Sequence, residues 1–129
     1  MTRKTPLGRV KGLGSAKSGS GHWWSQRMSA VALLPLGAWL ILSLARLVHR
    51  GATDYGSLVV WVQEPFNAMM LVATLLVVLY HSQLGVQVVL EDYAAEGASR
   101  VGSLMVQKFL HLIIAVIGVF SVLKIAFGA

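Results

Sequence analysis

The segment "LVVLYHSQLGVQVVLEDY" (residues 76–93) places polar side chains inside a long apolar run. His81 lies within this run, which ends abruptly at Glu91, Asp92 and Tyr93. A polar ring in such surroundings loses its hydrogen bonds with water, so it needs a partner or a function. The segment therefore predicts an apolar helix that carries a site.

The composition of the whole chain places this helix in a membrane. At 129 residues the chain is one domain at most, yet 56% of its residues are hydrophobic and only 12% are charged. A soluble domain of this size lacks the interior for so much apolar surface. We therefore expect an all-α integral membrane protein whose apolar side chains contact lipid.

Cysteine is absent from the chain, which excludes disulfides, thiolate nucleophiles and Cys-ligated metal or iron–sulfur sites. Any redox chemistry must then use a cofactor held by histidines or held between chains. The formal charge of +6 is compatible with nucleic acid, but six of the eleven basic residues lie in the first 27 positions, before the first apolar run. This distribution indicates membrane topology and no nucleic-acid partner.

Three apolar runs are long enough to cross a membrane, since about 20 helical residues span roughly 30 Å. We predict transmembrane helices at about 28–48, 58–90 and 104–127. They form an anchor domain, residues 22–129. A flexible basic arm rich in Gly and Ser, residues 1–21, precedes it.

The second helix has two candidate starts. A helix that begins near Ser57 contains Pro65 in its interior, whereas a helix that begins at Glu64-Pro65 uses the proline in its first turn, where proline is favoured. Both starts give a helix of membrane length that ends at about Leu90.

The basic residues also predict an orientation. The loop after the second helix returns to the N-terminal side, so that side carries eight basic residues and the opposite side carries three. Basic residues favour the cytoplasm. We therefore expect a multi-pass protein of the inner (cytoplasmic) membrane with a cytoplasmic N-terminus. The eight are Arg3, Lys4, Arg9, Lys11, Lys17, Arg27, Arg100 and Lys108, and the three are Arg46, Arg50 and Lys124.

His81 lies ten residues before Glu91, roughly 15 Å along a helix axis, and therefore near the middle of the bilayer. A neutral imidazole presents one nitrogen lone pair that suits a haem iron or another transition metal. A hydrogen bond to a neighbouring helix would equally account for a histidine at this depth. Spacing alone leaves both interpretations open.

Asp92 and Gly85 fall close to the helical face of His81, because they lie eleven and four residues after it. Gly85 would leave space for a flat macrocycle or permit close contact between helices. Tyr93 suits either a binding site at the membrane boundary or an aromatic belt. This face runs from the middle of the membrane to its cytoplasmic boundary.

A polar and aromatic cluster, "HWWSQR" (residues 22–27), precedes the first apolar run. Its two tryptophans are typical of interfacial anchors. We expect Arg27 to pair with a lipid phosphate, with Asp92, or with an acidic group of a cofactor. His111, in the third helix, is interpreted as an interfacial or packing residue rather than a ligand.

The spacing His81-x3-Gly85-x6-Asp92-Tyr93 resembles the motif of the smaller hydrophobic membrane-anchor subunits of succinate dehydrogenase, respiratory complex II. The preceding "HWWSQRMSAVALLPL" resembles the start of the first helix in that family, with its Arg-x-Ser/Thr-Ala pattern. The length, the three helices and the basic arm also agree, so the likeness covers most of the chain. The spacing from His22 to Arg27 departs from the family pattern by one residue.

The resemblance implies that the chain is half of a heterodimeric helix bundle. A second membrane-anchor subunit with three helices would complete the bundle, with a b-type haem between the two chains. His81 matches the axial ligand of the haem iron, and the partner would supply the other ligand. Tyr93 matches the residue whose hydroxyl donates a hydrogen bond to a quinone carbonyl, with Asp92 beside it. His22 and Arg27 fall near the haem propionates.

The complex implied by the resemblance is succinate:ubiquinone oxidoreductase, in which the flavoprotein and iron–sulfur subunits deliver electrons to ubiquinone. The chain would supply no catalytic residue and would not be catalytic alone. One alternative is the anchor of a quinol:fumarate reductase. Others are a structural subunit of another respiratory complex and a small proton-coupled transporter that uses Glu64 or His81.

Overall fold

The computed structural model describes residues 16–94 and 97–128. These residues form helices and no strands, as the sequence predicts. The helices are α2 (Ala16–His49), α3 (Tyr55–Gln63), α4 (Pro65–Tyr93) and α5 (Ala98–Ala126).

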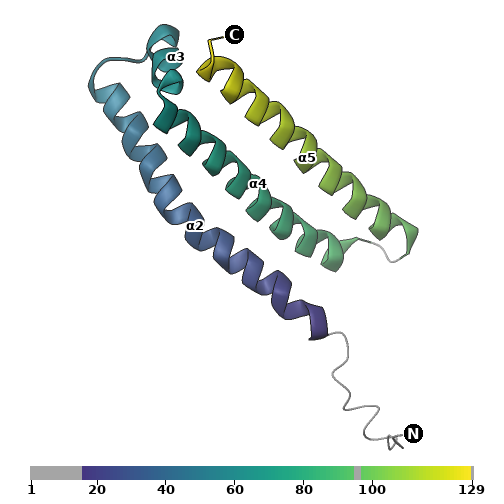
Figure 1. Cartoon of the computed structure of the whole chain (residues 1–129). Helices are drawn as coiled ribbons and strands as arrows, with labels where there is room; N and C mark the ends of the chain where they lie inside the picture. The colour runs from purple at the N-terminus through teal and green to yellow at the C-terminus, as the bar shows by residue number, and fades with distance from the viewer. Residues whose placement is uncertain (1–15, 95–96, 129) are drawn as a thin grey trace, which may run out of the picture.

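Helix α4 is the central element of the fold. It packs against α2 on one side and α5 on the other, while the short α3 contacts both α4 and α5. The three long helices lie side by side in one layer (Figure 1). The end of this layer where α2 begins, α4 ends and α5 begins is called the Tyr93 end, and the opposite end, which carries α3, is called the α3 end.

Helices α2, α4 and α5 are each long and apolar enough to cross a membrane, which confirms the three predicted spans. Their candidate spans are Ser20–His49, Pro65–Tyr93 and Ala98–Ala126. A helix of 29 residues is about 43 Å long, so each extends beyond a hydrocarbon core of about 30 Å.

Several helix boundaries differ from the predicted ones, and α5 begins at Ala98, six residues before the predicted start at 104. The segment predicted as one helix, 58–90, is divided at Glu64, whose extended backbone (φ −64°, ψ 120°) ends α3 and precedes Pro65 at the start of α4. Proline lacks an N–H and fits the first helical turn, so the Glu64-Pro65 start is the one that the chain adopts. Helix α4 also continues to Tyr93, which shortens the predicted loop 91–100.

The first helix starts earlier than predicted. It begins at Ala16, so the last six positions of the predicted arm, 16–21, are helical. The rest of that arm, residues 1–15, lies outside the described residues. Pro35 is accommodated within α2, as membrane helices allow.

The burial pattern of the described residues is that of a membrane protein. Only two apolar side chains, Ala68 and Leu84, are buried, whereas most large apolar side chains are exposed. Small and polar residues occupy the contacts between helices, where they let backbones approach and form hydrogen bonds. The buried polar residues are Ser29, Ser43, Thr74 and Gln107.

Helices α4 and α5 approach closely at Gly118. A Cβ atom at this position would lie 2.6 Å from Cδ2 of Leu75, closer than real Cβ contacts allow. Hydrogen bonds add to this contact, since the Gln107 amide donates to the backbone carbonyl of Gln83 at 2.8 Å. The contact between α4 and α5 therefore depends on the small size of Gly118 and on the hydrogen bond of the buried Gln107 amide.

The α3 end is ordered by aromatic side chains. Trp39 of α2 stacks on Trp61 of α3, with ring centroids 5.9 Å apart, and meets Phe66 of α4 edge to face at 6.3 Å. Asp54 caps α3 by accepting hydrogen bonds from the Ser57 hydroxyl at 2.6 Å and the Ser57 N–H at 3.0 Å. These hydrogen bonds hold the pKa of the Asp54 carboxyl below its usual value.

Candidate functional site

His81 lies near the middle of α4, twelve residues before the helix ends at Tyr93. At 1.5 Å per residue this is about 18 Å from the helix end, deep within the apolar span. The side chain is half-buried and faces α2. The fold thus keeps the imidazole away from bulk water and against a neighbouring helix.

Two side chains of α2 contact the His81 ring. The hydroxyl of Ser29 lies 2.9 Å from Nδ1, and the amide nitrogen of Gln26 lies 3.3 Å from Nε2. The Ser29 hydroxyl also donates to the backbone carbonyl of Gln26 at 3.0 Å. Both ring nitrogens are therefore engaged by one stretch of α2.

These contacts belong to a polar stripe on α2. His22, Gln26 and Ser29 follow one another at intervals of four and three residues, which places them on one helical face. Within this stripe, Nε2 of His22 and Oε1 of Gln26 are buried and have no hydrogen-bond partner. Buried polar atoms are almost always paired, so these two are among the exceptions within the described residues.

Gly85 lies on the same side of α4. A Cβ atom there would be 3.6 Å from the Gln26 amide nitrogen, an ordinary contact distance. The described structure therefore places Gly85 at the α2–α4 contact, one turn from His81.

The structure places Arg27 apart from this stripe. The side chain is exposed and its guanidinium carbon lies 5.5 Å from the centroid of the Trp23 ring. Such stacking on tryptophan is favourable for a cation at a membrane boundary. Within the described residues no ion pair joins Arg27 to Asp92.

Asp92 and Tyr93 form the last turn of α4 and are exposed, Tyr93 by 86%. Helix α4 runs without interruption from His81 to Asp92, so the eleven-residue spacing does place both residues close to one face. The carboxyl and the phenol are available to a ligand or partner at the Tyr93 end.

A hollow of about 410 Å³ lies in the groove between α2 and α4. Ser29 reaches it from α2, and Tyr80, the neighbour of His81, reaches it from α4. Its remaining lining is mainly apolar. The residues that line it are Trp24, Ser25, Met28, Ser29, Ala32, Val77 and Tyr80.

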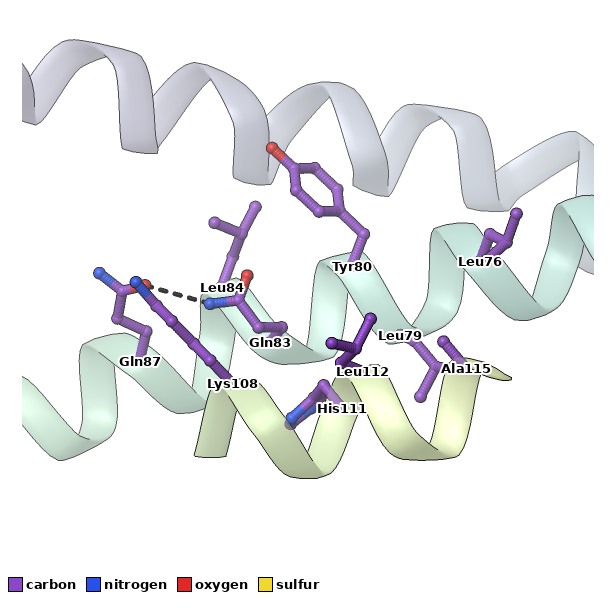
Figure 2. Close-up of a pocket in the computed structure, with 10 residues that line it drawn as sticks. All are labelled: Leu76, Leu79, Tyr80, Gln83, Leu84, Gln87, Lys108, His111, Leu112 and Ala115. Carbon is purple, nitrogen blue, oxygen red and sulfur yellow. Dashed lines mark hydrogen bonds between the residues drawn. The ribbon is translucent and has the colours of Figure 1, made fainter. Parts of the chain in front are cut away.

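A larger pocket of about 570 Å³ lies between α4 and α5, and His81 does not line it. Figure 2 shows Gln83, Gln87 and Lys108 gathered towards one end of this pocket, while Tyr80 points away from α5. A chain of amides follows α4 here: Gln83 donates to Gln87 at 3.2 Å, and Gln87 donates to Glu91 at 2.7 Å. These bonds satisfy polar groups in an apolar helix without any ligand.

His111 and Glu64, the two remaining residues considered from the sequence, lie away from the His81 contacts. His111 uses Nδ1 on the backbone carbonyl of Gln107 at 2.8 Å and Nε2 on the Ser82 hydroxyl at 3.3 Å. Glu64 is exposed at the break between α3 and α4. Neither residue contacts His81. No group of three His, Cys, Asp or Glu that could hold a metal ion occurs in the part of the chain that the structure describes.

Sequence reasoning missed Gln26 as a site residue and did not give Ser29 a role. One signal was available, because His22, Gln26 and Ser29 recur at helical spacing where an apolar helix begins. Their contact with His81 depends on how far α2 is shifted along α4, which no local pattern specifies.

Comparison with known proteins identifies the family of the chain. The family model described as "Succinate dehydrogenase/Fumarate reductase transmembrane subunit" matches residues 1–123. No solved structure matches the chain.

The curated proteins that resemble the chain belong to the same family. The succinate dehydrogenase hydrophobic membrane anchor subunit of Rickettsia conorii is 38% identical over 91 residues, 70% of each chain. The subunit of the same name from Rickettsia bellii is 32% identical over 118 residues, 91% of this chain and 83% of the relative. The one from Paracoccus denitrificans is 26% identical over 125 residues, 97% of this chain and 94% of the relative. With its three apolar spans and these relatives, this chain belongs to the family of succinate dehydrogenase/fumarate reductase transmembrane subunits.

Proposed function

We propose that the chain is a membrane-anchor subunit of succinate dehydrogenase that holds a b-type haem and forms part of the quinone-reduction site. The observation that carries this proposal is a mid-membrane imidazole, His81, set against a polar stripe in which the buried Nε2 of His22 lacks a partner. Family membership supports the same function. The chain alone is not catalytic, because the flavin and iron–sulfur chemistry belongs to other subunits.

The residues present fit a haem. The amide nitrogen of Gln26 can only donate a hydrogen bond, so the His81 Nε2 that faces it carries the lone pair an iron needs. Iron at Nε2 would replace the Gln26 contact. The buried Nε2 of His22 offers a further polar partner on the same stripe, suited to a propionate.

His81 would be one axial ligand, and the second membrane-anchor subunit would supply the other. His22 would bind a propionate from the α2 stripe, and Arg27 would do so from the membrane boundary once it leaves Trp23. A bound b-type haem would supply a one-electron carrier within the membrane. The protein would fix its position and set its electronic surroundings.

Ubiquinone is the proposed substrate, bound at the Tyr93 end. The exposed Tyr93 hydroxyl would donate a hydrogen bond to a quinone carbonyl and orient it. Asp92, one residue before, would pass protons from water to the reduced substrate. An apolar substrate from the bilayer and protons from the aqueous phase meet only at such a boundary.

We also propose an orientation and a set of partners. The N-terminus and the Tyr93 end would face the cytoplasm across the inner membrane, in agreement with the eight-to-three distribution of basic residues. The iron–sulfur subunit, with the flavoprotein subunit on it, would dock at this end and deliver electrons close to Tyr93. The chain would form half of a heterodimeric bundle with the second membrane-anchor subunit.

A quinol:fumarate reductase anchor is the second candidate, because the matching family includes fumarate reductase. The two differ only in the physiological direction of electron flow. A proton-coupled transporter is not supported by membership of this family.

Purification of the tagged chain from its native membrane tests the proposal. We expect flavoprotein and iron–sulfur subunits to copurify in equal amounts, with a second anchor and a b-type signal in the reduced-minus-oxidised spectrum. A chain that purifies alone, without flavin and without haem, would contradict the anchor function. Succinate reduction of ubiquinone against quinol oxidation by fumarate separates the two candidates.

A further inference from the structure

We propose that Ser29 is a positioning residue for the haem ligand: its hydroxyl accepts the Nδ1–H of His81 and so leaves Nε2 to the iron. This inference rests on the proposed haem function and deepens it. It concerns a contact between two side chains of this chain, 2.9 Å long.

The direction of the hydrogen bond follows from counting hydrogens. A serine hydroxyl has one hydrogen, and the Ser29 hydroxyl donates it to the backbone carbonyl of Gln26 at 3.0 Å. The same oxygen lies 2.9 Å from Nδ1 of His81, so it must accept there. The ring therefore carries its proton on Nδ1.

The contact at the second ring nitrogen agrees with this tautomer. Gln26 presents its amide nitrogen, a donor, to Nε2 at 3.3 Å. Two donors cannot share a hydrogen bond, so Nε2 holds a lone pair. Reversing the Gln26 amide would force Ser29 to donate to Nδ1 and would break its bond to the Gln26 carbonyl, so the arrangement with Nδ1–H keeps all three bonds.

Ser29 is suited to this role by size and burial. It is only 6% exposed, in the contact between α2 and α4, where small hydroxyl-bearing residues let helices approach and form hydrogen bonds. Its bond to the carbonyl three residues earlier fixes the hydroxyl rotor, so the acceptor lone pair points at the histidine without further ordering. Helix α2 therefore orients the proposed ligand.

A hydrogen bond to the second nitrogen of a ligating histidine has known consequences. It fixes the tautomer and the ring plane, and it raises the basicity of the nitrogen that binds the metal. Loss of such a partner typically weakens metal affinity by about 10- to 100-fold. A more basic ligand also favours the oxidised iron, so Ser29 is expected to lower the haem midpoint potential.

Gln26 has the opposite relation to the iron. Its amide occupies Nε2, the position the iron takes, and it must move aside when haem binds. Removing the Gln26 amide should therefore leave haem retention unchanged or increased, although it removes a contact with the same ring. Removing the polar group of Ser29 should therefore weaken haem retention, whereas removing that of Gln26 should not.

The test measures haem content and midpoint potential in the purified complex for four variants of this chain. Ser29→Ala removes the acceptor, and Ser29→Thr keeps a hydroxyl. Gln26→Ala removes the competing amide. Ser43→Ala is the matched control, because Ser43 is also a buried serine of α2, fourteen residues from Ser29.

We expect Ser29→Ala to lose haem about 10- to 100-fold more readily than the wild type and to raise the midpoint potential. Ser29→Thr should restore both values, and Ser43→Ala and Gln26→Ala should not reduce haem content. If Ser29→Ala does not assemble, Ser29→Cys, which keeps the volume but is a weak acceptor, should still raise the potential. An unchanged potential and haem content in the assembled variant would overturn the proposal.

His81→Ala in the same series separates this inference from the proposed function. Loss of the haem signal in His81→Ala, with Ser29→Ala unchanged, would leave the haem function standing and remove Ser29 from it. An unaltered haem in His81→Ala would overturn both.

Discussion

At the scale of single residues, the site depends on hydrogen bonds that balance across one helix contact. His81 is tolerable in a membrane because Ser29 and Gln26 satisfy both of its ring nitrogens. In the proposed tautomer, the Nε2 lone pair that accepts the Gln26 hydrogen bond is the one that would bind the haem iron. A polar ring can therefore be paired in the chain alone and still serve as a ligand in a complex.

The Tyr93 hydroxyl gives the most specific prediction at this scale. Tyr93→Phe keeps the ring and removes only the donor to a quinone carbonyl, so kcat/KM for quinone reduction should fall about tenfold. Succinate oxidation with an artificial acceptor should be unchanged, because the flavin and iron–sulfur subunits are intact. Tyr55→Phe is the control, because Tyr55 is similarly exposed, by 80%, but lies at the α3 end. Equal quinone turnover in the wild type and Tyr93→Phe would remove Tyr93 from the site.

The residue pattern of α4 was largely predictable from sequence. The spacing of His81 and Asp92 places them close to one face of any continuous helix, and α4 is continuous. The partners of His81 were not predictable, because Ser29 and Gln26 lie more than fifty residues away and their alignment depends on tertiary packing. The roles of Tyr93, Asp92, His22 and Arg27 remain predictions from the resemblance.

At the scale of helices, close packing and caps decide where elements begin and meet. The second span starts at Glu64-Pro65, and the other candidate start, near Ser57, falls in the separate helix α3, which Asp54 caps. Sequence periodicity could not separate α3 from α4, because the apolar pattern continues across the short break at Glu64. Membrane-facing helices have little amphipathic signal to mark a junction.

Gly118 gives a test of the α4–α5 contact. Gly118→Val would drive a side chain into Leu75, so the complex should lose about 1–3 kcal/mol of stability, measured by thermal inactivation or unfolding in detergent. Gly37→Val is the control, because a Cβ at Gly37 meets nothing within 4 Å. Gly118→Val with Leu75→Ala should recover part of the loss. Equal stability of the two valine variants would contradict the close approach.

Asp54 gives a pH-dependent test at the α3 end. Its pKa is lowered by the hydrogen bonds from Ser57, so the cap contributes at pH values above the usual carboxyl pKa of about 4 and is lost as the pH falls through the lowered value. The exchange protection of the Ser57 amide should follow this change. Asp54→Asn should keep protection without the pH dependence, and Asp54→Ala should lose it severalfold at every pH. Protection in Asp54→Ala equal to the wild type would refute the cap.

At the scale of the whole molecule, three helices in one layer leave both broad faces uncovered (Figure 1). Lipid can cover the apolar side chains of these faces. The class of the fold followed from composition alone. The rest of the proposed site could not, because we propose that other chains supply it.

The absence of cysteine makes the predicted orientation directly testable. Single cysteines introduced at two exposed positions, Thr53→Cys at the α3 end and Ser99→Cys at the Tyr93 end, report the side of the membrane. With a membrane-impermeant thiol reagent, Thr53→Cys should be labelled from outside the cell membrane. Ser99→Cys should react only after permeabilisation. The reverse pattern would place the Tyr93 end, and the electron-donating subunits, on the wrong side.

The most direct test of the central claim is the reduced-minus-oxidised spectrum of the purified complex in two histidine variants. His81 and His111 are both half-buried in membrane-spanning helices, and both ring nitrogens of each have close polar neighbours within the chain. We predict that His81→Ala loses or alters the b-type haem signal, while His111→Ala keeps the wild-type spectrum. A wild-type spectrum in His81→Ala would contradict His81 as the haem ligand.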